Sequence, residues 1–227
     1  MTLARHEADS AAAARAAREA ERRRAFMRIA ARVFRQHGLA AATMKQVAAA
    51  AGVTKMVLYR RFPSKDQLIH AIFSEIVQQL NASDSKPWPG YGADFRRSLA
   101  VARAFEDAYI LLVRDGGQQA AYQGYYQQLR KRGAQRLTAL LWWPNPPPPA
   151  SERPPLLHLT LEPMISFARD ALVYWVEHGD PARDADYIRW CGQMMRAWRS
   201  NAAELLNLDS PDVDWPFDPE IPSSRIV

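Results

Sequence analysis

Hydrophobic residues recur at helical spacing along most of the chain. Between residues 26 and 38 they occupy positions i, i+3, i+4, i+7 and i+8, and the run stops at a glycine: Phe26, Ile29, Ala30, Val33, Phe34 and Gly38. This spacing places them on one face of an amphipathic helix. We expect that helix to end at Gly38, because glycine readily takes the left-handed backbone that closes helices.

Two short helices are predicted next, with a glycine between them. Thr43-Met44-Lys45-Gln46 matches a capping box that opens the first, and Thr54 can cap the second, expected over 55–62. Gly52 permits a sharp turn at the junction. Two helices of about eight residues joined by a short glycine-containing turn are typical of a helix-turn-helix.

The remaining pattern predicts an all-α chain. A second capping box at 64–67 opens a linking helix over 64–81, and a bend follows over 81–92. Further apolar stripes predict helices over 95–112, 118–143, 160–178 and 182–208, with a stiff proline-rich loop at 144–149. We therefore expect an N-terminal arm (1–20), a three-helix helix-turn-helix domain (21–67), a helical domain (82–208) and an irregular tail (209–227). Ser10 can cap a helix beginning at residue 11, but the arm lacks an apolar stripe and is expected to be frayed or solvated.

Charge is distributed unevenly along the chain. The formal net charge is +6, yet residues 1–65 carry 14 Lys and Arg against four Asp and Glu, which is +10 and leaves −4 for the rest. A basic N-terminal third on a mildly acidic body is typical of a protein with one nucleic-acid-binding end. A solvated basic helix face would give the same numbers.

The second short helix carries the side chains expected to meet DNA. Its first residues, which in this motif face base edges in the major groove, are Thr54, Lys55, Met56 and Val57. Residues suited to phosphate contacts are Thr43, Lys45, Tyr59, Arg61 and Lys65. Tyr59 and Met56 could instead belong to the core, although Tyr59 follows Leu58 directly and both cannot be fully buried on one helix.

The stretch from Thr43 to Lys65 resembles the signature of the TetR family, and Ala30-Ala31-Arg32-Val33-Phe34 with Gly38 is similar to its first helix. The resemblance covers about residues 24–75 and implies a dimeric transcription regulator, usually a repressor, that binds a palindromic operator on double-stranded DNA. It assigns DNA contacts to Thr43, Lys45, Lys55, Tyr59 and Lys65. This chain departs from the common pattern at Arg61, where many members have His, and at Met56, where many have a small residue.

The resemblance also implies a homodimer built from the last two long helices. Apolar residues on them that could face a partner are Leu161, Ile165, Leu172, Trp175, Ile188, Met195, Trp198 and Leu205. The same stripes could instead pack within one monomer.

Family members usually hold a small-molecule effector inside the second domain. Aromatic residues that could line such a pocket are Tyr109, Tyr122, Tyr125, Tyr126, Trp142, Trp143 and Phe167, although an ordinary core position is the better reading of any single one of them. The aromatic content favours an apolar or aromatic effector.

Other classes of protein find less support. The five His are scattered without metal-ligand spacing, and no phosphate loop or nucleophile motif is present, so we predict no enzyme, no metal and no cofactor. The single Cys and the absence of a signal-peptide pattern or membrane span favour a cytoplasmic location. A non-specific architectural DNA-binding protein is the main alternative.

Overall fold

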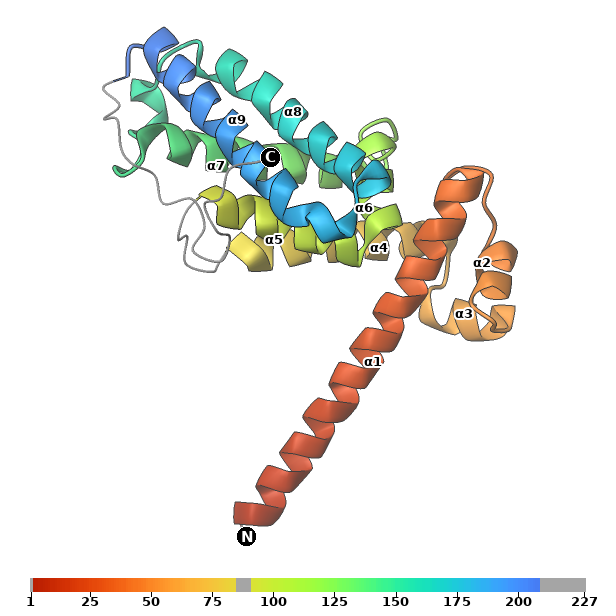
Figure 1. Ribbon diagram of the computed structural model, residues 1–227. Coiled ribbons are helices and arrows are strands. Elements are labelled where there is room, and N and C mark those ends of the chain that lie inside the picture. The colour runs from red at the N-terminus through yellow and green to blue at the C-terminus, as the bar shows by residue number, and fades with distance from the viewer. Residues whose placement is uncertain (1, 85–90, 209–227) are drawn as a thin grey trace. The chain divides into compact units, whose positions relative to one another are not determined.

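All regular structure in the described residues is helical, which confirms the predicted all-α fold (Figure 1). The computed structural model describes residues 2–84 and 91–208. The chain divides into two compact units, Met1–Ser74 and Glu75–Val227. Helix α4 (Lys65–Asp84) begins in the first unit and ends in the second.

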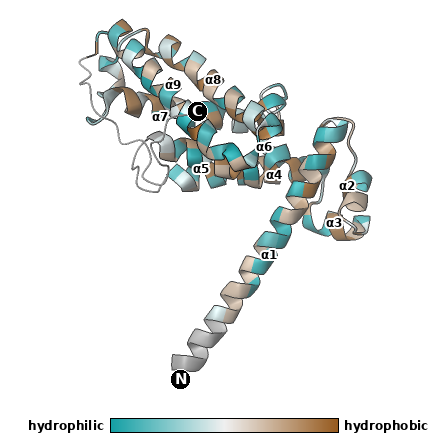
Figure 2. Cartoon of the chain, viewed as in Figure 1, coloured by the Kyte–Doolittle hydropathy of each residue, from teal (hydrophilic) through white to brown (hydrophobic). Residues whose placement is uncertain are grey.

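The N-terminal unit is a small helical domain with an apolar centre. It contains α1 (Thr2–His37), α2 (Met44–Ala50), α3 (Lys55–Arg61) and the first part of α4. Its fully buried side chains include Phe34, Leu58, Phe62 and Phe73. Figure 2 shows the hydrophobic residues of α1 gathered in its C-terminal half, beside α2 and α3. The predicted amphipathic helix is thus the part of α1 that supports the helix-turn-helix.

The N-terminal arm differs from the prediction, because α1 runs unbroken from Thr2 to His37 and does not start after a cap at Ser10. The arm is rich in Ala, Arg and Glu, which are strong helix formers, and no Gly or Pro interrupts it. Helix propagation from the packed half into this segment therefore needs no new nucleus. From residue 10 to residue 19 its side chains are exposed, as expected for a segment without an apolar stripe.

The C-terminal unit is a bundle of longer helices. It contains the end of α4, α5 (Tyr91–Ala104), α6 (Glu106–Arg114), α7 (Gln123–Trp142), α8 (Leu157–His178) and α9 (Asp184–Leu205), with short 3-10 turns at Ala150–Glu152 and Pro181–Arg183. One part of its core joins α7, α8 and α9 through Leu141, Leu161 and Met195. None of the helices within 2–84 and 91–208 combines the length and hydrophobicity that a bilayer crossing requires.

Several predicted element boundaries in this unit are wrong. Helix occupies both ends of the expected 81–92 bend, since α4 continues to Asp84 and α5 begins at Tyr91. The expected 95–112 helix is interrupted at Phe105, whose φ of −140° and ψ of 46° are not helical. The Tyr-rich helix begins at Gln123, after a series of turns, and not at residue 118. The predicted irregular tail, 209–227, lies outside the described residues.

A half-buried arginine next to the break between α5 and α6 bonds to residues far along the chain. Arg103, near the end of α5, donates from Nη2 to Asp184 Oδ1 at 2.9 Å and from Nη1 to the carbonyl oxygen of Val176 at 3.1 Å. Trp175 Nε1 also donates to Asp184 Oδ1, at 2.7 Å. These contacts tie α5 to the corner between α8 and α9, a long-range constraint that local periodicity does not reveal.

Candidate nucleic-acid interface

Side-chain caps and one left-handed glycine set the geometry of α2 and α3. Thr43 Oγ1 accepts from Gln46 N at 3.3 Å, and Gln46 Oε1 accepts from Thr43 N at 2.8 Å, which confirms the predicted capping box. Gly52 has a φ of +63°, and Thr54 caps α3 by accepting from Val57 N at 3.4 Å. The two helices therefore meet across a glycine turn, as a helix-turn-helix requires.

The buried and exposed faces of α3 are clearly separated. Leu58 and Phe62 point inward and are fully buried. Met56 is 82% exposed and Tyr59 is 44% exposed, so neither belongs to the core. We call the exposed predicted residues the recognition surface: Thr43, Lys45, Thr54, Lys55, Met56 and Tyr59.

Two of the predicted phosphate contacts, Lys65 and Arg61, also bond to groups within the unit. Lys65 Nζ donates to the carbonyl oxygens of Leu39, Ala40 and Ala42 at 2.9, 2.8 and 3.2 Å. The Arg61 guanidinium pairs with Glu19 of α1 and lies 5.4 Å from the centre of the Phe26 ring.

In this arrangement Lys65 stabilises the loop between α1 and α2, and Arg61 links α3 to α1. Val57, the remaining predicted contact, is half-buried.

Arg60 is an exposed cation on α3 that the sequence reading left out. It lies one helical turn after Met56, and residues four apart share a face of a helix. That spacing is the signal that could have placed it beside the recognition surface.

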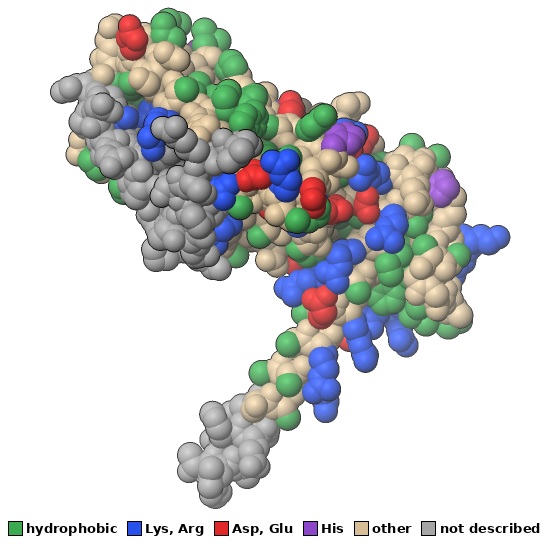
Figure 3. Space-filling view, viewed as in Figure 1, with side chains coloured by type: hydrophobic (Ala, Val, Ile, Leu, Met, Phe, Trp, Pro, Cys, Tyr) green, Lys and Arg blue, Asp and Glu red, His purple; other side chains and the backbone are tan. Residues whose placement is uncertain are grey.

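Further cations line the exposed half of α1. Arg15, Arg18, Arg22 and Arg23 are all exposed. Figure 3 shows the Lys and Arg side chains gathered over the N-terminal unit. A surface dense in cations beside a helix-turn-helix can neutralise DNA phosphates.

Comparison with known proteins agrees with this geometry. Residues 27–72 match the family model "Bacterial regulatory proteins, tetR family". This segment is a TetR-type DNA-binding segment. The match spans α2 and α3, which carry the recognition surface, and the adjoining parts of α1 and α4.

Solved structures extend the likeness to the C-terminal unit. A TetR-like transcriptional regulator from Rhodococcus sp. RHA1 aligns over 80% of this chain and 96% of its own, with a TM-score of 0.60 and 18% identity. A tetR-family transcriptional regulator from Streptomyces coelicolor aligns over 82% and 83%, with a TM-score of 0.54 and 17% identity. At these identities the likeness is one of fold. A comparison with curated proteins finds no match.

The C-terminal unit contains a partly open cavity of about 500 Å³. Apolar side chains from several helices line it, among them Phe95, Leu140, Ile165, Leu172 and Met195. Four arginines and two aspartates line it as well: Arg130, Arg132, Arg136, Arg169, Asp84 and Asp94. Tyr109 also faces the cavity, and burial raises its pKa to about 12, so its hydroxyl stays protonated.

The predicted aromatic residues and the lining of this cavity overlap only in part. Tyr109 and Trp143 line this cavity, whereas Tyr122, Tyr125, Tyr126, Trp142 and Phe167 do not. Tyr122 is buried elsewhere in the unit, and Tyr126 accepts a hydrogen bond from Arg169. The sequence reading followed aromatic content and missed the arginines, although the spacing of Arg132 and Arg136 places both on one face of α7.

The predicted dimer residues are mostly interior. Leu161, Ile165, Leu172, Ile188 and Met195 are buried within the single chain, Trp175 and Trp198 are half-buried, and Leu205 is exposed. The stripe on each helix therefore faces its own unit, which was the alternative left open by the sequence.

A different set of large apolar side chains is exposed on α8 and α9. We call it the α8–α9 face: Leu159, Phe167, Tyr174, Trp190 and Met194. The rings of Phe167 and Trp190 lie 5.6 Å apart, so the two helices meet on this face. Figure 3 shows hydrophobic side chains over this part of the unit.

Within the described ranges, no group of three or more His, Cys, Asp or Glu side chains is arranged to hold a metal ion.

Proposed function

We propose that this chain is a TetR-family regulator that binds a palindromic operator as a homodimer and represses transcription until a small molecule enters the cavity. The observation that carries the proposal is the exposure of Lys55, Met56 and Tyr59 on a helix whose opposite face is fully buried. Met56, Lys55 and Tyr59 are therefore accessible together on the helix that would enter the major groove.

On this proposal each exposed residue of the recognition surface has a role. Lys55 donates to guanine O6 or N7, and Met56 makes apolar contact with a thymine methyl group. Tyr59 and Lys45 contact phosphates, and Thr43 fixes the N-terminus of α2 beside the backbone. Arg61 and Lys65 support this surface from within the unit.

The dimer would form through the α8–α9 face of two chains. A single helix-turn-helix reads only a few base pairs, and two copies related by a two-fold axis read both halves of a palindrome. The exposed aromatic and Met side chains of this face are the types enriched in protein interfaces. The identification rests on exposure and on the family's usual assembly.

Regulation would follow from a shift between conformations. An effector that binds the cavity more tightly in one state favours that state, and a changed spacing of the two α3 helices no longer fits two successive major grooves. The cavity of about 500 Å³ is large enough for a small organic molecule.

Selection of duplexes from a random library tests the DNA-binding role. We expect enrichment of a palindrome whose affinity exceeds that of random duplex by about 10³-fold or more at fixed salt. A ratio below about ten would support the alternative, an architectural protein that binds DNA without sequence preference.

A further inference from the structure

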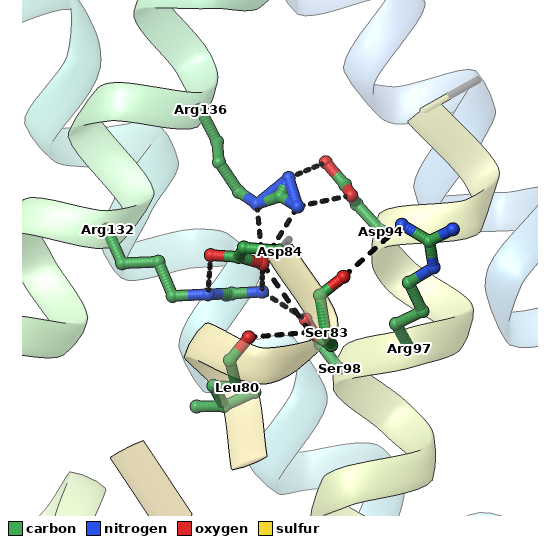
Figure 4. A network of polar contacts seen from close by, with 8 residues as sticks. All are labelled: Leu80, Ser83, Asp84, Asp94, Arg97, Ser98, Arg132 and Arg136. Carbon is green, nitrogen blue, oxygen red and sulfur yellow. Dashed lines mark hydrogen bonds and ion pairs between the residues drawn. The ribbon is translucent and has the colours of Figure 1, made fainter. Parts of the chain in front are cut away.

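A cluster of four charged side chains forms the most polar wall of the cavity (Figure 4). Arg132 of α7 donates from Nε and Nη2 to the two carboxylate oxygens of Asp84, at 2.8 Å each. Arg136, one turn later, lies with Nη2 2.8 Å from the same Asp84 Oδ1, and its Nη1 donates to Asp94 Oδ2 at 2.8 Å. One carboxylate is therefore shared by two guanidinium groups.

Asp84 is held in an unfavourable place. It is the last residue of α4, where the helix dipole places partial negative charge, so the helix itself disfavours a carboxylate there. Its position depends on the two arginines of α7. A competing carboxylate that did not suffer this repulsion would pair with the same arginines more favourably.

The arginines cannot readily do without an anionic partner. Burial lowers the pKa of the Arg136 guanidinium, against the opposing effect of Asp94. Arg132 and Arg136 together with Asp84 and Asp94 carry no net charge. An anion that simply joined them would leave an excess negative charge, whereas an anion that replaced one carboxylate would keep the balance.

The rest of the cavity favours a ligand with an apolar body. Apart from this cluster and the two further arginines, the wall is built mainly of aliphatic and aromatic side chains. Those arginines, Arg130 and Arg169, pair with Glu162 and Asp170, which do not line the cavity. These two arginines therefore line the cavity, while the carboxylates that pair with them do not.

We propose that the cavity binds an organic acid with an apolar body, whose carboxylate takes the place of Asp84 on Arg132 and Arg136. The proposal rests on the effector role proposed above and names the chemical class of the effector. A guanidinium group can donate two parallel hydrogen bonds to one carboxylate, and the apolar body of the ligand would fill the rest of the cavity. Displacement of Asp84 would release the end of α4, the helix whose other end lies in the N-terminal unit.

Three ten-carbon probes test the ligand class on the unmodified protein. Titration calorimetry with decanoate, decan-1-ol and decylamine compares an acid, an alcohol and an amine of equal length. We expect decanoate to bind at least about tenfold more tightly than the other two, since hydrogen bonds to charged partners are the stronger ones. Equal affinities, or no binding of decanoate, would overturn the proposal without requiring any variant to fold.

Asp84→Asn tests the exchange itself. Removing the internal competitor should tighten decanoate binding about tenfold and leave decan-1-ol unchanged. Asp186→Asn is the matched control, because Asp186 also bonds to two arginines, Arg183 and Arg189, but does not line the cavity. The same change in decanoate affinity in both variants, or no change in the affinity of Asp84→Asn, would contradict the replacement of Asp84 by the ligand carboxylate.

Operator affinity, measured with each probe, separates this inference from the proposed function. If decanoate binds preferentially but leaves operator affinity unchanged, the ligand class stands and release by an effector is refuted. If the alcohol releases the operator as well as the acid does, regulation stands and the ligand class is refuted.

Discussion

Basic and polar side chains of the N-terminal unit either stabilise its fold or extend into solvent, and their contacts distinguish the two cases. Lys65 donates to three backbone carbonyls and Arg61 pairs with Glu19, whereas Lys55 and Met56 extend into solvent. A basic residue in a family motif is thus not by itself a phosphate contact. Its partners within the chain decide how far it can reach.

The Glu19–Arg61 pair offers a test at this scale. Glu19→Gln should free Arg61 for a phosphate, and each additional phosphate contact steepens the slope of log affinity against log salt by about 1. The measurement is fluorescence anisotropy with random duplex across a salt series. Glu21→Gln is the control, since it removes the same charge but pairs with Arg28 and Arg24. Equal slopes for the two variants would show that Arg61 gains no contact.

The reactivity of Cys191 provides a second test at this scale, because its side chain is buried in the C-terminal unit. Burial raises the pKa of its thiol to about 12. Because the thiolate is the reactive form and forms only as pH approaches that value, the folded protein should resist thiol reagents at pH 8 and react on unfolding. The measurement is labelling by a chromogenic disulfide reagent with and without denaturant. Rapid labelling of the native protein would contradict this burial.

At the scale of elements, caps and glycines set the helix-turn-helix, and tertiary contacts set the C-terminal unit. The capping box at Thr43, the Thr54 cap and the left-handed Gly52 were all predictable, because each depends on neighbours within a few residues. The break at Phe105 was not predictable in this way, and Arg103, two residues before it, bonds to Asp184, far along the chain. Local sequence between residues 95 and 112 is compatible with one helix.

Gly52→Ala tests the turn. A Cβ there would meet nothing within 4 Å, so the cost is confined to the backbone at a φ of +63°. We expect a loss of about 1–2 kcal/mol in the free energy of unfolding, measured by denaturant titration. Gly124→Ala in α7 is the matched control, also without a contact within 4 Å, and should stabilise slightly by helix propensity. Equal effects would refute a special role for Gly52.

At the scale of the whole molecule, the chain separates a basic DNA-facing unit from a unit that holds a cavity and an apolar face. Much of this division was visible in the charge asymmetry and the family motif. The sequence did not show which side chains face the cavity or the surface, because an apolar stripe on a helix indicates only that one face is buried. Leu161 and Met195 prove to be buried inside the unit, whereas Trp190 and Met194 are exposed.

Trp190→Glu tests the proposed assembly. A charge in the centre of the α8–α9 face should turn a dimer into a monomer, because burying an unpaired carboxylate is costly. Sedimentation velocity measures the mass of each species. Met56→Glu places the same charge on an exposed apolar residue of the other unit and should leave the dimer intact. A dimeric Trp190→Glu protein would locate the interface elsewhere.

The central claim is that the recognition surface reads DNA sequence, and the base preference of Lys55→Ala tests it most directly. Duplexes selected from one random library by the unmodified chain and by Lys55→Ala should differ at one position of each half-site, where the preference for guanine is relaxed, at a cost of about 1–3 kcal/mol. Identical preferences for the two proteins would contradict the account.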